Sequence, residues 1–232
     1  MSVELEVVRE NLAGARATIV EAARRSGRDA GAVELLAAVK YVAPEDLPVL
    51  AEAGITLVGE NRVEQLLAKQ AAHGEPFTWD FIGHLQSRKA RDLVGRVRLV
   101  HSLSTLSAAE RLERSSGEHP IACLVEVNVA GEHSKEGLAP ESLDDFLTAV
   151  ADLPHVRIEG LMTMPPLAEA PEGSRRHFAA LRELAGELAA HWSGRHGFER
   201  LSMGTSQDYA VAVEEGATIV RLGSTLYRRS SV

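Results

Sequence analysis

Eight short apolar runs, separated by segments with helical periodicity, constrain the fold of this chain more than any other feature. Each run has the length of a β-strand and is bounded by turn or cap residues. The runs are ELLAAVK (34–40), ITLVGE (55–60), FTWDFIGH (77–84), RLVHSL (98–103), IACLVEVNV (121–129), VRIEGLMTM (156–164), RLSMGTS (200–206) and TIVRLGSTL (218–226). Their nearly continuous apolar character is typical of parallel strands that are covered by helices.

The alternation of strands and helices predicts an α/β fold, a single (β/α)8 TIM-type barrel formed by residues 1–232 as one domain. One intervening helix is expected in NRVEQLLAKQA (61–71), where Asn61 and Glu64 resemble a capping pair. A doubly wound open sheet is the alternative. The glycine-rich dinucleotide turn that would follow its first strand is missing, which favours the barrel.

An additional N-terminal helix is expected before Gly27. Its apolar face consists of Leu5, Val8, Leu12, Ile19 and Ala23. After the last predicted strand only YRRSSV (227–232) remains, which is too short for a closing helix. We therefore expect the leading helix to cover the gap beside that strand.

Composition excludes several classes of protein. The formal charge of −8 argues against a general nucleic-acid or membrane-surface binder. No apolar run approaches the roughly 20 residues of a membrane helix, and MSVELEVVRE lacks the features of a signal peptide. The single cysteine, Cys123, excludes an intramolecular disulfide and is expected to be a buried, inert thiol. We expect a cytoplasmic monomer.

Polar residues gather at the C-terminal ends of the predicted strands, where barrels of this kind carry their chemistry. They are Lys40, Glu60, Asn61, His84, Gln86, His101, Ser102, Asn128, Thr163, Ser202, Ser206, Arg221, Gly223 and Ser224. His84 and His101 lack the HExxH spacing or the carboxylate cluster of a metal site, so we interpret them as hydrogen-bonded histidines and predict no metal.

Two of these strand ends are suited to an anion. Ser206 lies at the expected start of the helix DYAVAVEE (208–215), where free N–H groups and the helix dipole favour a phosphate. Gly223 and Ser224 follow the last strand, and barrels often bind phosphate after strands seven and eight. Two ordinary caps are the alternative for each end alone. Because the two strand ends are adjacent, we predict that together they bind a phosphate.

Lys40 ends the first apolar run at the same mouth. A lysine ringed by barrel residues is partly desolvated, which frees its amine to attack a carbonyl. A reactive amine facing a phosphate site indicates a phosphorylated aldehyde such as pyridoxal 5′-phosphate (PLP). Arg221 would lie between the Lys40 amine and the phosphate site and could hydrogen-bond the pyridine nitrogen. Spacing alone equally allows a phosphosugar aldolase, and a structural lysine that reaches solvent from the strand end is the simplest alternative.

An ordered series of motifs then resembles a known family. The motifs are VKYV, GENRVEQLLAK, FIGHLQSRKAR, HSLS, EVNVAGEHSKEGL, IEGLMTMPP and LSMGTSQDYAVAVEEGATIVRLGSTLY. Together, from about Val33 to Tyr227, they closely resemble the pyridoxal phosphate homeostasis protein family, single-domain relatives of the alanine racemase barrel.

The resemblance implies a PLP-binding barrel of fold type III, with particular roles for seven residues. Lys40 would be the Schiff-base lysine and Arg221 the partner of the pyridine nitrogen. The phosphate ligands would be Ser206, Gly223 and Ser224. Asn61 and His84 would line the cofactor pocket. The chain departs from the family pattern at Tyr41, at Arg88 and in the tail after Tyr227.

The family is associated with intracellular PLP supply and not with a robust enzymatic activity. The resemblance therefore implies a non-catalytic homeostasis protein, with apo forms of PLP-dependent enzymes as acceptors. Arg221 fits this role, because an arginine stays protonated and can only donate to the pyridine nitrogen, which weakens the ring as an electron sink. A PLP-dependent amino-acid racemase or lyase is the alternative.

Overall fold

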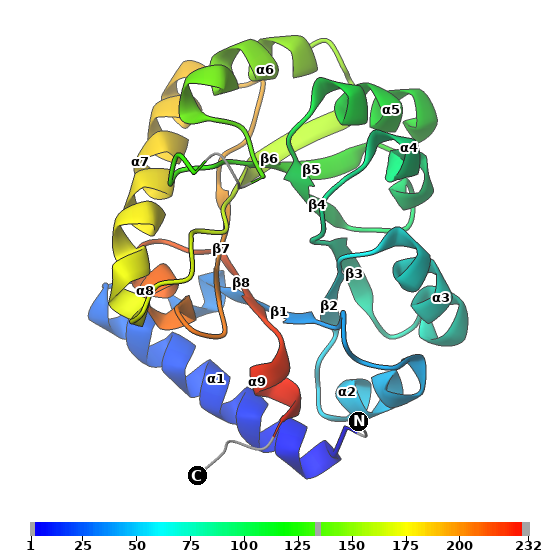
Figure 1. Cartoon of the computed structure of the whole chain (residues 1–232), viewed down its shortest axis with the longest axis vertical. Helices are drawn as coiled ribbons and strands as arrows, with labels where there is room; N and C mark the ends of the chain where they lie inside the picture. The colour runs from blue at the N-terminus through cyan, green and yellow to red at the C-terminus, as the bar shows by residue number, and fades with distance from the viewer. Residues whose placement is uncertain (1–2, 133–135, 229–232) are drawn as a thin grey trace.

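The eight predicted strands form a closed parallel barrel in sequence order, in which β1 pairs with both β2 and β8 (Figure 1). The structure is a computed structural model that describes residues 3–132 and 136–228. The strands are β1 (Glu34–Ala38), β2 (Leu57–Glu60), β3 (Thr78–Phe81), β4 (Leu99–Leu103), β5 (Ile121–Glu126), β6 (Val156–Met162), β7 (Arg200–Thr205) and β8 (Ile219–Leu222). The barrel prediction is confirmed.

Helices surround the barrel as an outer layer (Figure 1). They are α1 (Leu5–Arg25), α2 (Leu47–Glu52), α3 (Val63–His73), α4 (Ser87–Ala90), α5 (Leu106–Ser116), α6 (Leu143–Val150), α7 (Arg175–His191), α8 (Tyr209–Glu214) and α9 (Ser224–Tyr227). Within the described part of the chain, none of them is both long enough and apolar enough to cross a bilayer.

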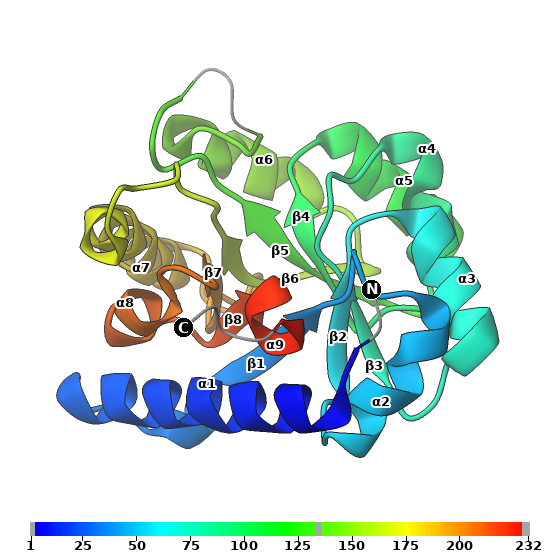
Figure 2. The ribbon, with the colours of Figure 1, turned by 60° about the horizontal axis from the view of Figure 1, so that its bottom comes forward.

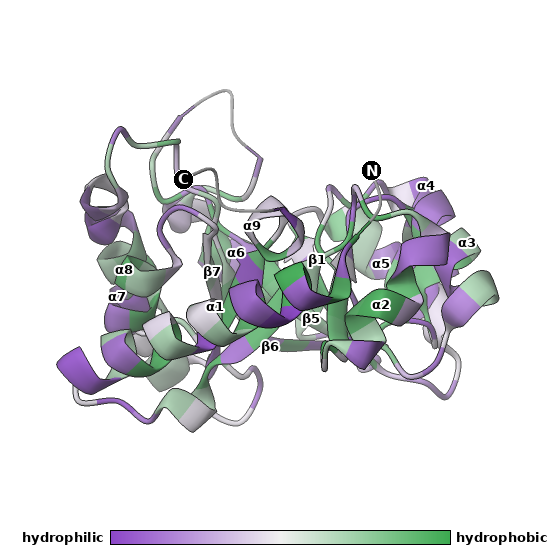
Figure 3. Ribbon diagram, turned by 90° about the horizontal axis from the view of Figure 1, so that it is seen from below, coloured by the Kyte–Doolittle hydropathy of each residue, from purple (hydrophilic) through white to green (hydrophobic). Residues whose placement is uncertain are grey.

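The core has two parts, one on each side of the strands. A small cluster that includes Leu36, Leu99, Leu124 and Ile219 lies inside the barrel. The larger part lies between the strands and the helices; Figure 3 shows green stretches in the strands and helices that carry both hydrophobic and hydrophilic residues. Cys123 belongs to this outer part; it is buried as predicted, and burial raises the pKa of its thiol.

The strands end earlier than the apolar runs suggested. β1 stops at Ala38, so Lys40 lies two residues beyond it. At the other end of the chain, Ser224 to Tyr227 form the single-turn helix α9 and not the end of a strand. Apolar composition did not reveal this change, because Leu226 and Tyr227 are buried in the helix as they would be in a strand.

The predicted capping pair of Asn61 and Glu64 is wrong. α3 begins at Val63, and its N-cap residue Arg62 makes no side-chain capping bond. The backbone N–H of Asn61 donates to Oε1 of Glu60 at 2.8 Å, and Glu64 pairs with Lys89. Asn61 is therefore part of the β2 end and lies outside the helix.

The N-terminal helix α1 takes the place expected for it, alongside α8 and α9 on the outside of the barrel (Figure 2). Val8, Leu12, Ile19 and Ala23 are buried against the barrel. α1 thus supplies the covering layer that α9, with four residues, is too short to supply.

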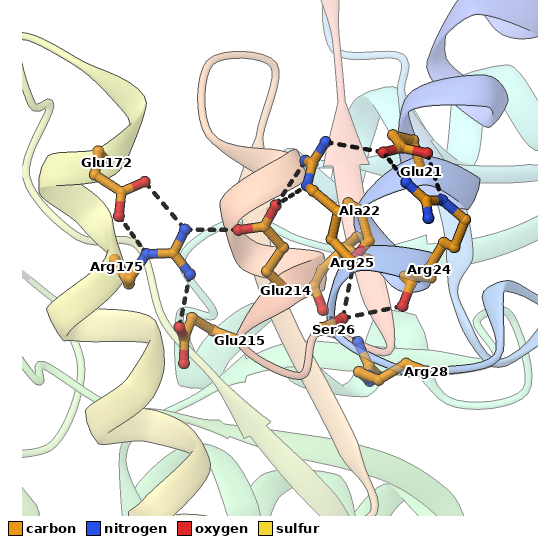
Figure 4. Close-up of polar contacts among 12 residues, drawn as sticks. Glu21, Ala22, Arg24, Arg25, Ser26, Arg28, Glu172, Arg175, Glu214 and Glu215 are labelled. Atoms are coloured by element: carbon orange, nitrogen blue, oxygen red, sulfur yellow. Dashed lines mark hydrogen bonds and ion pairs between the residues drawn. The ribbon is translucent and has the colours of Figure 1, made fainter.

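An ion-pair network ties α1 to α8 and α7 (Figure 4). Arg25 of α1 lies 2.6 Å from Glu214 of α8, and Arg175 of α7 lies 2.6 Å from the other oxygen of the same carboxylate. Arg175 also contacts Glu215 at 2.8 Å, and it pairs with Glu172. We call Arg25, Arg175, Glu172, Glu214 and Glu215 the outer ion-pair network.

Candidate functional site

The ends of β7 and β8 bring a small polar cluster together at the mouth of the barrel. Oγ of Ser206 lies 2.8 Å from Oγ1 of Thr225 and accepts a hydrogen bond from the backbone N–H of Gly223 at 3.3 Å. Ser224, between Gly223 and Thr225 in the chain, is exposed. The structure therefore brings together the three residues that the sequence proposed as phosphate ligands. It adds Thr225, whose hydroxyl in the same GST segment was the overlooked signal.

The sequence predicted that Ser206 lies at the start of a helix, and this prediction is wrong. α8 begins at Tyr209, and the residue before it, Asp208, accepts from the backbone N–H of Thr205 at 2.7 Å. Gly204, inside β7, has a φ of +89°, and a Cβ there would lie 2.5 Å from that of Ala212, so the close approach of β7 to α8 requires glycine. Ser206 lies in the turn between β7 and α8, and its Oγ contacts Thr225 and Gly223 at the β8 end.

Arg221 lies inside the barrel, with 5% of its surface exposed. Its Nη2 donates to the carbonyl oxygen of Thr163 at 3.0 Å and its Nη1 donates to Oγ of Ser202. Burial lowers the pKa of Arg221 to about 10, while Glu126 and Asp208 act in the opposite direction. The guanidinium therefore stays protonated at neutral pH and acts only as a donor.

Lys40 is exposed, so the expectation of a partly desolvated amine is wrong for this structure. Its Nζ lies 5.2 Å from the ring centroid of Tyr41, within the range of a cation–π interaction, and the Tyr41 side chain is 82% exposed. Lys40 lines a pocket of about 430 Å³ whose far wall is formed by Glu64 and Ala68 of α3. In the described part of the chain, no hydrogen bond joins Lys40 to Ser206.

The backbone that carries Lys40 is held by a buried ion pair. Lys69 of α3 and Glu60 of β2 are 2% and 0% exposed and lie 2.5 Å apart. Nζ of Lys69 also donates to the carbonyl oxygen of Val39 at 2.6 Å, directly before Lys40. Sequence reasoning missed this contact. The signal was the spacing of Lys69, three residues after Leu66 on the buried face of its helix.

Asn61 and His84 meet at the ends of β2 and β3. A Cβ on Gly83 would lie 2.0 Å from the carbonyl oxygen of Asn61, so only glycine allows these backbones to approach so closely. The His84 side chain is 46% exposed, and its Nδ1 lies 3.0 Å from Oε2 of Glu136. Both residues line a polar pocket of about 250 Å³, with Arg88 on the same rim.

The sequence profile of the alanine racemase N-terminal domain matches residues 11–231. The pyridoxal phosphate homeostasis protein of Aquifex aeolicus is 40% identical over 221 residues, which cover 94% of this chain and 96% of the relative. This chain belongs to the pyridoxal phosphate homeostasis protein family. The family resemblance of the motifs is thereby confirmed.

Solved structures agree with the family assignment. PipY of Synechococcus elongatus, which is described as solved without PLP, superposes with a TM-score of 0.84 at 32% identity and covers 95% of this chain and 100% of its own. The structure of the same protein with PLP bound gives a TM-score of 0.82 at 32% identity, with the same coverage. A relative with this barrel thus binds PLP.

The homeostasis-family motifs fall at the strand ends described above. GEN (59–61) ends β2, IGHLQ (82–86) follows β3, and the residues from SMG to VRLG span β7 and β8. The SKEG motif of the same family includes Ser134 and Lys135, which lie outside the described residues, as does the tail after Arg228.

Proposed function

We propose that this chain binds PLP at the barrel mouth and holds it for intracellular supply. The observation that carries the proposal is the convergence of Ser206, Gly223 and Thr225 just beyond the ends of β7 and β8, the strand that contains Arg221. Two hydroxyl groups and a backbone N–H at this point are suited to phosphate oxygens, and barrels of this kind use the same loops for phosphate. PipY, with PLP bound, supports the cofactor assignment.

The proposed site assigns the phosphate to Ser206, Gly223 and Ser224, with Thr225 beside them. Arg221 donates to the pyridine nitrogen, since a protonated guanidinium offers only donors. PLP supplies an aldehyde whose carbon forms a Schiff base with the Lys40 amine and releases water. Asn61 and His84 line the rim next to β2 and β3.

Lys40 suits this role because its backbone is fixed while its side chain is free. The Lys69 contact holds the Val39 carbonyl, and the exposed side chain of Lys40 rotates about four carbon–carbon bonds. In the proposed complex the Lys40 side chain would leave the Tyr41 ring and turn toward the aldehyde, and its nitrogen would give up a proton to solvent to become the free amine.

We further propose that the bound cofactor is passed to apo forms of PLP-dependent enzymes and is not used for turnover. A donor at the pyridine nitrogen leaves the ring a weak electron sink, which suits storage better than carbanion chemistry. The second candidate, an amino-acid racemase or lyase, is favoured only by the match to the alanine racemase N-terminal domain. Incubation of the PLP-loaded protein with D- and L-amino acids separates the two, because sustained turnover of any of them contradicts the storage role.

The absorption spectrum of the PLP-loaded protein tests the cofactor site. We expect a band from the lysine-bound cofactor that Lys40→Ala abolishes, because the other lysines in the described part of the chain have partners elsewhere: Lys69 is buried against Glu60, and Lys89 pairs with Glu64. The matched control is Lys89→Ala, which removes an ammonium that pairs with Glu64 and should leave the band intact. Persistence of the band in Lys40→Ala, or its absence from the loaded wild-type protein, would refute the assignment.

A further inference from the structure

We infer that His101 is a positioning residue for Arg221 and acts on it through the hydroxyl of Ser202. The inference rests on the proposed function, because it concerns how the donor for the pyridine nitrogen is held. It follows from four buried polar side chains, Arg221, Ser202, His101 and Asp80, which we call the interior network. All four lie within the strands of the barrel, on β8, β7, β4 and β3.

The contacts of the interior network form an unbroken series. Arg221 donates from Nη1 to Oγ of Ser202. The same Oγ lies 2.8 Å from Nδ1 of His101, and Nε2 of His101 lies 3.0 Å from Oδ2 of Asp80. Ser202, His101 and Asp80 are 0% exposed, so bulk water does not compete for these bonds.

The guanidinium of Arg98 binds Asp80 from the side opposite His101 with two hydrogen bonds. Nε of Arg98 lies 3.0 Å from Oδ1 of Asp80, and Nη2 lies 2.7 Å from Oδ2. Arg98 also contacts Glu34 at the first residue of β1. A bidentate arginine is a strong partner for an ionised carboxylate, which makes Asp80 an acceptor toward His101.

The two ends of the interior network determine where the protons lie. Because Asp80 accepts, Nε2 of His101 carries a hydrogen and donates it. Burial lowers the pKa of His101, so the ring is neutral and Nδ1 is an acceptor. The Ser202 hydroxyl therefore donates to Nδ1 and keeps its lone pairs for Arg221. All the hydrogen bonds thus point in one direction, from Arg221 toward Asp80.

This direction has a consequence for Arg221. One edge of its guanidinium is engaged by Ser202 and the Thr163 carbonyl, so the plane of the group is fixed. Its other N–H groups can then meet the pyridine nitrogen without reorganisation when PLP enters. Without His101 to orient the hydroxyl, Ser202 would be free to turn its proton toward Arg221, which weakens the contact.

Two substitutions of His101 separate the two contacts of its ring. The side-chain oxygen in His101→Asn takes the place of Nδ1 and still accepts from Ser202, whereas the amide nitrogen in His101→Gln takes the place of Nε2 and only donates to Asp80. We expect His101→Gln and Ser202→Ala to weaken PLP binding about tenfold and to shift the absorption maximum of the bound cofactor. His101→Asn should stay within about twofold of the wild-type affinity.

The matched control is His155→Gln, which removes another histidine–carboxylate contact, at 2.6 Å to Glu113, from the opposite end of the barrel. It should change neither the affinity nor the spectrum. Equal PLP affinity and spectra for folded His101→Gln and wild type would overturn the inference. Equal losses in His101→Asn and His101→Gln would also overturn it, since the effect would then not pass through Ser202.

Nitrogen NMR of the PLP-free wild-type protein gives a test that needs no variant. We expect the His101 ring to carry its proton on Nε2 with Nδ1 bare, and a proton on Nδ1 overturns the inference. This measurement decides the question if the variants do not fold. If wild-type protein binds no PLP, the proposed function fails on its own, while the His101 tautomer still reports whether the interior network is oriented as described.

Discussion

Lys69 shows how a single buried side chain supports a residue that it does not touch. Its ammonium binds Glu60 and the Val39 carbonyl, and Glu60 in turn accepts from the backbone of Asn61. One ion pair therefore holds the backbone next to two of the predicted site residues. The Glu60 carboxylate has no exposed surface, so it depends on this partner for compensation of its charge.

We expect Lys69→Met to lower the free energy of unfolding by about 3 kcal/mol, because it leaves the Glu60 carboxylate buried without a countercharge. Adding Glu60→Gln should restore part of the loss, since a neutral amide still accepts from Asn61. Urea unfolding of the single and the double variant measures both effects. The control is Lys89→Met, whose partner Glu64 is exposed; a loss as large as that of Lys69→Met would contradict the argument.

At the scale of elements, α1, α8 and α7 are joined by the outer ion-pair network. Hydrogen bonding to Arg175 lowers the pKa of Glu214 below its usual value, and Arg25 acts in the same direction. A carboxyl group with a lowered folded-state pKa stabilises the protein above its unfolded pKa. That contribution is lost as the pH falls through the folded value.

We expect Arg175→Gln to cost about 1 kcal/mol in the free energy of unfolding at neutral pH, and the difference from wild type to shrink below about pH 4 as Glu214 is protonated in both proteins. High salt should shrink it as well. Urea unfolding between pH 3 and pH 7 measures the trend. Arg176→Gln removes the adjacent exposed arginine and should have little effect. A difference that grows at low pH would disprove this account.

Element order could be predicted from the sequence, but the side-chain contacts at the mouth could not. Apolar runs reveal strands because burial on both faces demands them, and the buried stripe of α1 was visible for the same reason. The exposure of Lys40 depends on its rotamer, and the partners of Ser206 depend on how the loops after β7 and β8 approach each other. Neither the rotamer nor the loop geometry has a periodic pattern in the sequence.

The interior network could likewise be predicted only in part from the sequence. His101 was correctly interpreted as a hydrogen-bonded histidine, but it was assigned to a strand end, whereas it lies within β4 with its ring inside the barrel. Its partners Asp80 and Ser202 are 21 and 101 residues away in the sequence. Only closure of the barrel brings β3, β4, β7 and β8 together around one interior, and strand spacing alone does not give that register.

For the molecule as a whole, the position of α1 makes it part of the barrel's outer layer and not an appendage. We expect Leu12→Ala, at a residue that is 3% exposed, to cost about 2–5 kcal/mol in the free energy of unfolding. Circular dichroism and the fluorescence of Trp79 and Trp192 should then shift together, because the domain unfolds as one unit.

The control for this prediction is Val20→Ala in the same helix. Val20 is 55% exposed, so its substitution should change the free energy of unfolding by less than about 0.5 kcal/mol. If Leu12→Ala instead produced an early transition in circular dichroism with unchanged tryptophan fluorescence, α1 would unfold separately. The proposed integration of the helix would then be wrong.

Closure between β1 and β8 also limits how this protein can meet another one. A sheet without a free edge offers no row of unpaired backbone groups to which a foreign strand could be added. If PLP passes to an acceptor enzyme as proposed, that enzyme must therefore recognise loops and helix surfaces around the mouth. The same closure removes a common route to aggregation, the pairing of exposed strand edges between copies of the chain.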